Sequence, residues 1–340
     1  MRFETAILTD QESIATLIPE WDELSRRDPH STPYQTGSLT IGLGDLSSSR
    51  GTPYIVVARS DAGVLVGVLP LHRVRGGGRL GGQRLEGYTT WHTSYFDCSV
   101  DPAVPEAGQA LLDAVRANRD WDRCDLRFLR PEANLLRGCA GARDGSDGSF
   151  QTIRREAFVE RNGGGGVTPH KAARRLSKAG EVLFTAAEPL DQIGATIQRF
   201  AAIHTNRWAA SGKAAEFADP SVSDQLARLL GVAAGSGLCR IGTLRLSGEI
   251  VAVHIAFRWR GVQFSWRMAH DAQWQETSPG RLLMSLMIEE AFESGCQEYD
   301  LGRGNDEYKQ RWPTEARPLS RLILPGRTWR GRIATFRSRY

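Results

Sequence analysis

The sequence predicts a mixed α/β protein of two domains, each with a mixed, mostly antiparallel sheet flanked by helices. Its 340 residues suffice for two domains of ordinary size, each with its own core. Segments that alternate with period two are interspersed with segments of helical spacing. Four consecutive glycines, Gly163–Gly166, favour a linker because glycine restricts the backbone least. We therefore expect domains at residues 1–160 and 168–340, joined by a linker at 161–167.

The first half has the pattern of a mixed α/β domain. A strand at Phe3–Leu8 precedes a helix at Ile14–Arg26, whose apolar face includes Trp21 and Leu24. The other elements expected here are a hairpin of Tyr54–Ala58 and Val64–Val74, a helix at Ala107–Arg116, and buried strands at Asp125–Leu129 and Gln151–Val159.

The second half shows a clear order of elements. Thr168 and Pro169 suit a helix start, and a basic helix follows to Lys178. Beyond it we expect helices at Leu190–Ala210 and Val222–Ala234, antiparallel strands at Leu238–Leu246, Ile250–Trp259 and Val262–Ala269, a helix at Ser278–Ser294, and strands at Glu298–Leu301 and Leu319–Leu324.

Composition narrows the class of protein. No apolar run reaches the roughly 18 residues of a membrane span, and the first residues lack a signal-peptide core, so we expect a cytoplasmic protein. The cysteines are scattered and odd in number, without a C-x-x-C pair, which argues against a disulfide framework or a metal site. They are Cys98, Cys124, Cys139, Cys239 and Cys296.

Basic residues gather in two places although the net charge is only +4. No acid follows Glu315, whereas seven arginines do, and the helix at 168–178 is also basic. Such segments attract phosphate-rich partners such as a cofactor, a carrier arm or RNA. A solvated basic surface is the alternative interpretation in both places.

Two motifs carry most of the candidate functional residues. The first, Thr277-Ser278-Pro279-Gly280-Arg281, has the composition of a helix start, where free N–H groups and the helix dipole favour anions. The second spans residues 296–312, in which a short strand ends at Asp300 and a glycine turn leads into a charged segment. Loops after strands often carry function on a rigid support.

These motifs resemble the GNAT acyltransferase superfamily, and more closely its CelD/BioF2-like branch, which is related to Fem-type peptidyltransferases. The resemblance covers about residues 168–325 and includes His204-Thr205-Asn206-Arg207-Trp208 and the Asp300–Trp312 motif. The first half resembles the branch more weakly, through Val68-Leu69-Pro70-Leu71 and Tyr95-Phe96-Asp97. The resemblance implies two GNAT-like domains, a degenerate one on the acceptor side and a C-terminal acyltransferase domain.

The resemblance also assigns roles at the acyl-donor end of the site. It implies that the phosphates of coenzyme A lie at the helix start formed by Ser278, Gly280 and Arg281, although Ser-Pro-Gly replaces the more general glycine pattern of GNAT enzymes. Arg303 and Lys309 are candidate cationic partners for phosphate or carboxylate. A plain capped helix and a structural salt-bridge cluster are the alternatives.

The remaining candidates concern proton transfer and the acceptor. His254 lies mid-strand between alanines, so it is a candidate general base, with Asp300 as a second. Buried, hydrogen-bonded structural roles are the alternative for both. Residues that we expect to contact the acceptor are His92, Tyr95, Asp97, His204 and Arg207, for which aromatic packing is the alternative.

The resemblance implies an N-acyltransferase that moves an acyl group from a thioester to an amine of a small-molecule acceptor by direct attack. Acyl-CoA is the expected co-substrate, and a phosphopantetheinyl acyl-carrier protein is the second choice, without a metal. Backbone N–H groups on a splayed strand would stabilise the oxyanion. The alternatives are a Fem-type transferase that uses aminoacyl-tRNA, and a non-catalytic protein that binds an acyl or carrier partner in polysaccharide assembly.

Overall fold

The computed structural model describes residues 3–46, 51–75, 82–88, 92–138, 146–161, 170–210, 217–326 and 328. The chain divides into two compact units: unit 1 is Met1–Ser149 with Arg317–Tyr340, and unit 2 is Phe150–Ala316. This division differs from the expected ranges in two places. Residues 150–160 fall in unit 2, and the chain from Arg317 falls in unit 1, because strand β13 (Thr314–Pro325) pairs with a strand of unit 1. The expected Gly163–Gly166 linker, Thr168 and Pro169 lie outside the described residues.

Unit 1 contains a sheet in the strand order β1-β2-β3-β4-β6-β13, antiparallel except for the pair β4–β6. Its strands are β1 (Phe3–Leu8), β2 (Thr52–Ser60), β3 (Leu65–Arg75), β4 (Gln83–Gly87), the short β5 (Ser99–Val100), which pairs with β3, and β6 (Arg123–Leu129). Its helices are α1 (Gln11–Arg27), α2 (Gly37–Asp45), α3 (Ala107–Ala117) and α4 (Asn134–Gly138), with a 3-10 turn at Pro33–Gln35.

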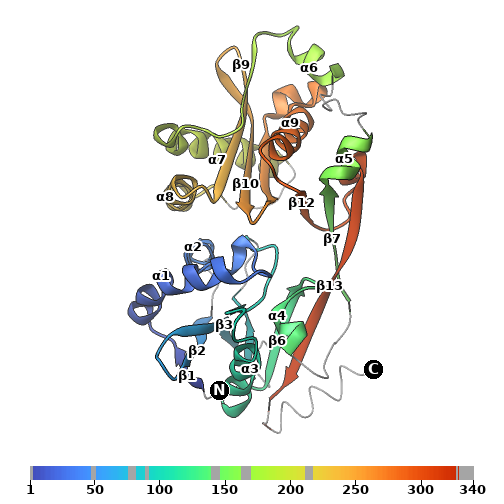
Figure 1. Ribbon diagram of the computed structural model, residues 1–340. Helices are drawn as coiled ribbons and strands as arrows, with labels where there is room; N and C mark the ends of the chain where they lie inside the picture. Colours follow the sequence, from blue (N-terminus) through green and yellow to red (C-terminus); the bar gives the residue numbers. More distant parts are fainter. Residues whose placement is uncertain are drawn as a thin grey trace. The chain divides into compact units, whose positions relative to one another are not determined.

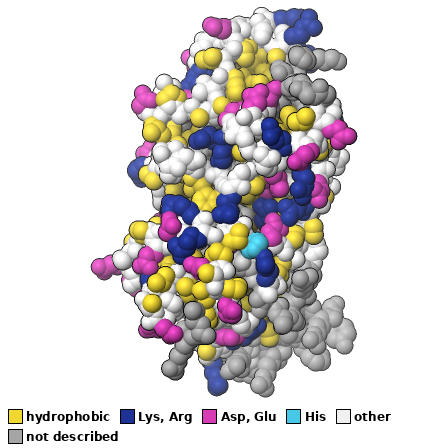
Figure 2. Space-filling view, in the orientation of Figure 1, with side chains coloured by type: hydrophobic (Ala, Val, Ile, Leu, Met, Phe, Trp, Pro, Cys, Tyr) yellow, Lys and Arg dark blue, Asp and Glu magenta, His cyan; other side chains and the backbone are white. Residues whose placement is uncertain are grey.

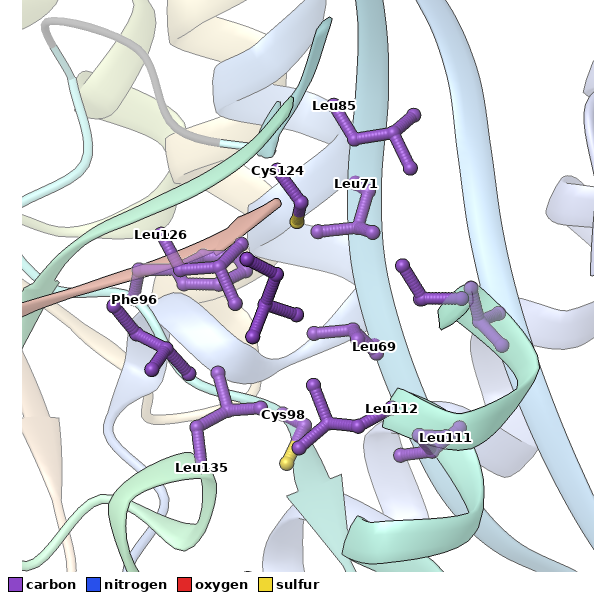
Figure 3. Close-up of a cluster of buried hydrophobic side chains, with 14 of the residues drawn as sticks. Leu69, Leu71, Leu85, Phe96, Cys98, Leu111, Leu112, Cys124, Leu126 and Leu135 are labelled. Carbon is purple, nitrogen blue, oxygen red and sulfur yellow. The ribbon is translucent and has the colours of Figure 1, made fainter. Parts of the chain in front are cut away.

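The core of unit 1 forms because α1 and α3 are amphipathic. Trp21 and Leu24 of α1 are fully buried in a cluster with residues of β2 and β3. Leu111 and Leu112 of α3 belong to a second cluster, with side chains of β2, β3, β4 and β6 (Figure 3). Burial of a large aliphatic side chain contributes about 1.5–3 kcal/mol, so these two clusters hold the helices on the sheet.

Unit 2 contains a sheet in the strand order β7-β12-β11-β10-β9-β8, antiparallel except for the pair β11–β12. Its strands are β7 (Ser146–Arg154, from Phe150 onward), β8 (Val182–Thr185), β9 (Cys239–Leu246), β10 (Glu249–Trp259), β11 (Val262–His270) and β12 (Glu298–Arg303). Its helices are α5 (Arg155–Arg161), α6 (His170–Leu176), α7 (Ile193–Ala210), α8 (Pro220–Gly235) and α9 (Pro279–Glu293), with 3-10 turns at Leu190–Gln192, Ala272–Thr277 and Glu307–Arg311.

Helices cover both faces of the unit 2 sheet (Figure 1). Leu283 and Met287 of α9, with Leu176 of α6, pack in one cluster with Leu244 and Ala252, on one face of β9 and β10. Helices α7 and α8 lie on the other side of the sheet in Figure 1. The strands alternate their side chains between these two layers, as a sheet buried on both faces requires.

The two units repeat one order of elements. Each contains a strand and two helices, then a three-stranded antiparallel meander, and then a helix and a strand parallel to the last meander strand. In unit 1 this set is β1, α1, α2, β2, β3, β4, α3 and β6; in unit 2 it is β8, α7, α8, β9, β10, β11, α9 and β12. The expected fold class, with mixed sheets flanked by helices, is confirmed.

Most of the expected elements are present, and one is wrong in part. The strand expected at Gln151–Val159 ends at Arg154, where α5 begins. Phe158 of α5 is buried with its ring 4.9 Å from that of Phe292, so contact with α9 overrides the strand pattern. Helix α2 and strands β4 and β8 were not expected, because each is short and weakly patterned.

Surface charge is mixed, and the cysteines of the described residues are buried. No helix among the described residues is long and apolar enough to cross a membrane. Figure 2 shows basic and acidic side chains mixed on the face that it draws, in keeping with the small net charge. Cys98, Cys124, Cys239 and Cys296 are buried thiols that form no disulfide, and Cys139 lies outside the described residues.

Candidate active site

The parallel strands β11 and β12 pair over a short stretch and then separate. Pairing covers Val262 to Phe264 on β11, opposite Glu298 to Asp300 on β12. Strand β11 nevertheless continues to His270, and β12 continues to Arg303. The sheet of unit 2 therefore opens beyond Phe264, between two strands that both carry on.

A β-bulge in β11 lies at the start of this opening. Ser265 is opposite Ala256 of β10, whereas Arg267 is opposite the adjacent Ile255, so Trp266 is the additional residue. A bulge bends its strand and increases the local twist, which ends regular pairing with a neighbour. The bulge thus gives a physical cause for the separation of β11 from β12.

Helix α9 begins near the far end of β11. Ser278 occupies the N-cap position with a left-handed backbone (φ 55°) and no capping hydrogen bond from its side chain, and Pro279 is the first helical residue. A Cβ on Gly280 would lie only 2.9 Å from Nδ1 of His270, the last residue of β11. Glycine at 280 therefore lets the imidazole approach the first turn, while Arg281 is exposed beside it.

The turn after β12 is fixed by two buried polar side chains. Oδ1 of Asp300 accepts a hydrogen bond from the N–H of Gly302 at 2.7 Å. Nζ of Lys309 donates to the carbonyls of Gly302, Arg303 and Gly304 at 3.2, 2.5 and 3.1 Å and lies 3.2 Å from the Asp306 carboxylate. These contacts favour turn-forming roles for Asp300 and Lys309.

Burial shapes the charge at this turn. Lys309 is only 2% exposed, and burial lowers its pKa against the raising effect of Asp306. Its three N–H donors face carbonyl oxygens and a carboxylate, which leaves the ammonium poorly placed for a ligand phosphate. Arg303 is half-buried at the end of β12, so it is the better cationic candidate of the two.

Tyr308 adds a phenol next to this turn. It is 39% exposed, and Nζ of Lys309 lies 5.9 Å from its ring centre. Burial of part of the side chain, with the nearby Asp306, raises its pKa to about 12. The phenol is therefore protonated at neutral pH and able to donate a proton.

The structure places His254 in the interior of unit 2. It is fully buried, opposite Met268 of β11 and Gly242 of β9, and its Nε2 lies 3.0 Å from Oγ of Ser265. Burial lowers its pKa to about 4. The imidazole is therefore neutral near pH 7, yet no part of it is exposed to take a proton from an acceptor.

His204 and Arg207 lie on α7. The His204 ring lies among Phe200, Trp208 and Phe217, with ring centres 5.7, 5.7 and 5.0 Å away. Burial, with the charges of Arg267 and Arg207, lowers its pKa to about 4. Arg207 is exposed. Aromatic packing thus accounts for His204, and Arg207 remains the more accessible candidate for acceptor contact.

The three expected acceptor residues of unit 1 are all buried: His92, Tyr95 and Asp97. Asp97 accepts hydrogen bonds from the N–H groups of Cys98, Asn134 and Leu135 at 2.8, 2.6 and 3.0 Å. Burial nevertheless raises its pKa to about 8. Tyr95 packs edge-on against Tyr34 at 5.9 Å. These contacts favour a structural role, and acceptor binding by this loop stays a prediction.

Sequence reasoning missed three residues that the structure brings to the opening. Ser265 and Trp266 define the bulge, and His270 packs on the helix start. The strand expected at Val262–Ala269 gave no sign of a bulge, because a bulge is defined by pairing with the partner strand, which the sequence of one strand does not show. Among the described residues, no group of three or more His, Cys, Asp or Glu side chains is arranged to hold a metal ion.

Part of the sequence matches a known protein family. Residues 170–310 match the family model described as an acetyltransferase (GNAT) domain. The match includes β11, the start of α9 and β12, so the opening lies within it. None of the curated proteins matches the sequence.

Solved structures resemble the chain over nearly its whole length. FemX is similar with a TM-score of 0.61 at 12% identity, over 93% of this chain and 96% of that chain. The L-PGS structure from Bacillus licheniformis is similar with a TM-score of 0.57 at 14% identity, over 97% and 96%. At such low identity the similarity concerns the fold alone.

Proposed function

We propose that this protein is an N-acyltransferase of the CelD/BioF2-like branch that transfers an acyl group from a thioester to an amine of a small molecule. The observation that carries the proposal is the opening between β11 and β12, which starts at the Trp266 bulge. An extended acyl-thioester arm would lie between two strands that both continue beyond the end of their mutual pairing. Acyl-CoA is the preferred donor and an acyl-carrier protein the second.

The helix start supplies the anion end of the proposed site. Ser278, Gly280 and Arg281 lie at the N-terminus of α9, where the helix dipole and an exposed guanidinium favour phosphate. Arg303, at the end of β12, is a second cation on the same open pair of strands. These groups suit a donor with a thioester at one end and phosphates at the other.

Several groups of this chain would contribute to the chemistry. Backbone N–H groups of β11 beyond the bulge would stabilise negative charge on the thioester oxygen. Tyr308 is protonated at neutral pH, so it can supply a proton to the departing sulfur. His254, buried and neutral, suits a supporting role better than that of general base.

The direct experiment incubates the protein with acetyl-CoA, longer acyl-CoAs and acyl-carrier protein in the presence of a panel of amines. Release of free thiol, dependent on the amine, is expected with at least one donor. Thermal unfolding with coenzyme A alone provides a second readout, because a bound ligand raises apparent stability. The proposal would be refuted if no donor gave thiol release and none gave a thermal shift.

A Fem-type transferase using aminoacyl-tRNA is the second candidate. The observation that favours it is the pair of exposed arginines on α6, Arg174 and Arg175, together with a fold shared with FemX. Each phosphate contact releases counterions, so binding to charged tRNA would weaken steeply with salt. Transfer that ribonuclease abolishes would favour this candidate, whereas ribonuclease-resistant transfer with a shallow salt slope would favour coenzyme A.

A further inference from the structure

Ser265 lies at the point where β11 leaves β12. It follows Phe264, the last residue of β11 paired with β12, and precedes the bulge residue Trp266. The serine is half-buried, and its carbonyl oxygen is 3.8 Å from the position that a Cβ on Gly302 of β12 would occupy. Its hydroxyl is held by Nε2 of His254 on β10, 3.0 Å away.

The surroundings of His254 keep its imidazole fixed and uncharged. Opposite it on β9, a Cβ on Gly242 would lie 2.2 Å from Sδ of Met287, so α9 covers this part of the sheet closely. Opposite it on β11, Met268 packs against the cluster that contains Met284. A ring enclosed in this way cannot exchange protons readily with a substrate, but it can orient a neighbour.

The hydrogen-bond pattern indicates which nitrogen of His254 carries the proton. Nδ1 has no hydrogen-bond partner in the part of the chain that the structure describes. A buried N–H donor without an acceptor is rare and costly, so the proton of the neutral ring belongs on Nε2. Nε2–H then donates to Oγ of Ser265, which leaves the serine's own proton for another acceptor.

We propose that Ser265 donates a hydrogen bond to the carbonyl oxygen of the thioester, and that His254 is the positioning residue that fixes the serine hydroxyl. The inference rests on the proposed function and adds a catalytic side chain to it. The amine nitrogen bonds to the carbonyl carbon, the carbon–sulfur bond breaks, and a proton from the amine ends on the thiol. Ser265 keeps its proton and stabilises the charge that develops on oxygen.

The kinetic test compares Ser265→Ala, His254→Ala, His254→Gln and the double variant S265A/H254A. Loss of one oxyanion donor lowers kcat by about 10²–10³-fold in well-studied cases, so we expect Ser265→Ala to lose at least about tenfold in kcat with a nearly unchanged donor KM. Glutamine places an amide N–H near the position of Nε2, so His254→Gln should retain much of the activity that His254→Ala loses. The double variant should be no slower than Ser265→Ala.

Two outcomes would overturn the inference. One is a Ser265→Ala variant with wild-type kcat. The other is a His254→Ala substitution that lowers kcat as much in the Ser265→Ala background as it does in the wild type. Melting temperatures are measured for all variants, and His254→Gln serves if His254→Ala does not fold. If the wild-type protein transfers nothing from any thioester, the proposed function fails, and the catalytic role of Ser265 fails with it.

A second readout does not depend on activity. Long-range ¹H–¹⁵N NMR spectra distinguish the two tautomers of a neutral histidine, and His254→Gln assigns the signal. We expect the Nε2–H form at pH 7, with a change in the signal in Ser265→Ala. An Nδ1–H form would reverse the donor in the pair and contradict the inference, even in a protein whose acyl transfer is established.

Discussion

Units 1 and 2 repeat the same elements but end their parallel strand pairs differently. In both, three residue pairs join the parallel strands: Arg84 to Glu86 with Arg123 to Asp125 in unit 1, and Val262 to Phe264 with Glu298 to Asp300 in unit 2. In both, the later strand continues beyond the pairing. The segment that follows the last meander strand then determines whether other residues lie beside the parallel strands beyond their last pair.

In unit 1, residues of the segment after β4 occupy the region beyond the last residue pair of β4 and β6. The N–H of Phe96 donates to the carbonyl of Phe128 on β6 at 3.3 Å, and a Cβ on Gly87 of β4 would lie 2.8 Å from the Phe96 ring. Figure 3 shows Phe96 close to Leu126 in the core. The segment that supplies Phe96 connects β4 to α3 through residues 88–106.

In unit 2 the corresponding connection is short. Strand β11 runs on to His270, and the 3-10 turn Ala272–Thr277 leads directly into α9. The bulge at Trp266, rather than an inserted segment, shapes the end of the strand. One fold can therefore place a connecting segment beside its parallel pair or do without one, and unit 2 is the unit in which we propose the donor site.

Deleting Trp266 should have the largest effect. Without the additional residue, β11 can pair regularly past Phe264, and the backbone donors of the opening are lost from the site. We expect kcat/KM to fall by about 10²–10³-fold in a protein that stays folded. Trp266→Ala is the matched control, because it removes the ring and keeps the bulge. Equal activity of the deletion variant and the wild type would contradict this difference between the units.

Arg303→Met should have the next largest effect. Loss of a charge-assisted contact costs about 1.5–3 kcal/mol, which corresponds to a decrease of roughly ten- to hundredfold in kcat/KM. Arg311, which is exposed, serves as the matched control position, and kcat/KM of Arg311→Met should stay within about twofold of the wild-type value. A lower melting temperature with full activity per folded Arg303→Met molecule would instead make Arg303 structural.

Gly280 gives a smaller and more specific effect. A side chain there would press on His270, so Gly280→Ala is best made together with His270→Ala, and compared with His270→Ala alone. We expect the donor KM to rise by about tenfold, since the methyl group lies at the helix N-terminus that we propose as the phosphate site. Gly87→Ala in unit 1, where a Cβ would lie 2.8 Å from the Phe96 ring, should lower the melting temperature and leave the donor KM unchanged.

The two units should respond to pH in opposite directions. The pKa of Asp97 in unit 1 rises from 3.8 to about 8, so the folded state holds a proton that the unfolded state releases, and unit 1 loses stability as pH rises through that range. The pKa of His254 in unit 2 falls from 6.5 to about 4, so unit 2 loses stability as pH falls through that range.

Hydrogen exchange resolved by unit measures these two slopes. His254→Gln should reduce the stability that unit 2 loses as pH falls. Part of that loss should remain, because the pKa of His204 also falls to about 4. Asp97→Asn should remove the slope in unit 1, at a lower overall stability, because an amide N–H would face the N–H of Asn134. Parallel pH responses in both units would contradict these assignments.

The sequence was sufficient for the elements and insufficient for several side-chain roles. Long periodic segments such as Leu190–Ala210 and Ile250–Trp259 were placed closely, because burial on one face or both leaves a strong pattern. The buried contacts of Asp97 and Lys309 could not be foreseen, since their partners are backbone groups brought close only by the fold. The same holds for Ser265 and His254, which meet across two strands.

Hydrogen exchange with and without acetyl-CoA is the decisive measurement of whether the donor lies in the opening of unit 2. We expect slower exchange in peptides covering residues 265–282, from the bulge to the first turn of α9, and in those covering 301–304. Peptides from residues 83–98 in unit 1, where Phe96 fills the corresponding place, should be unaffected. Protection of residues 83–98 with no change at 265–282 would contradict this placement of the donor.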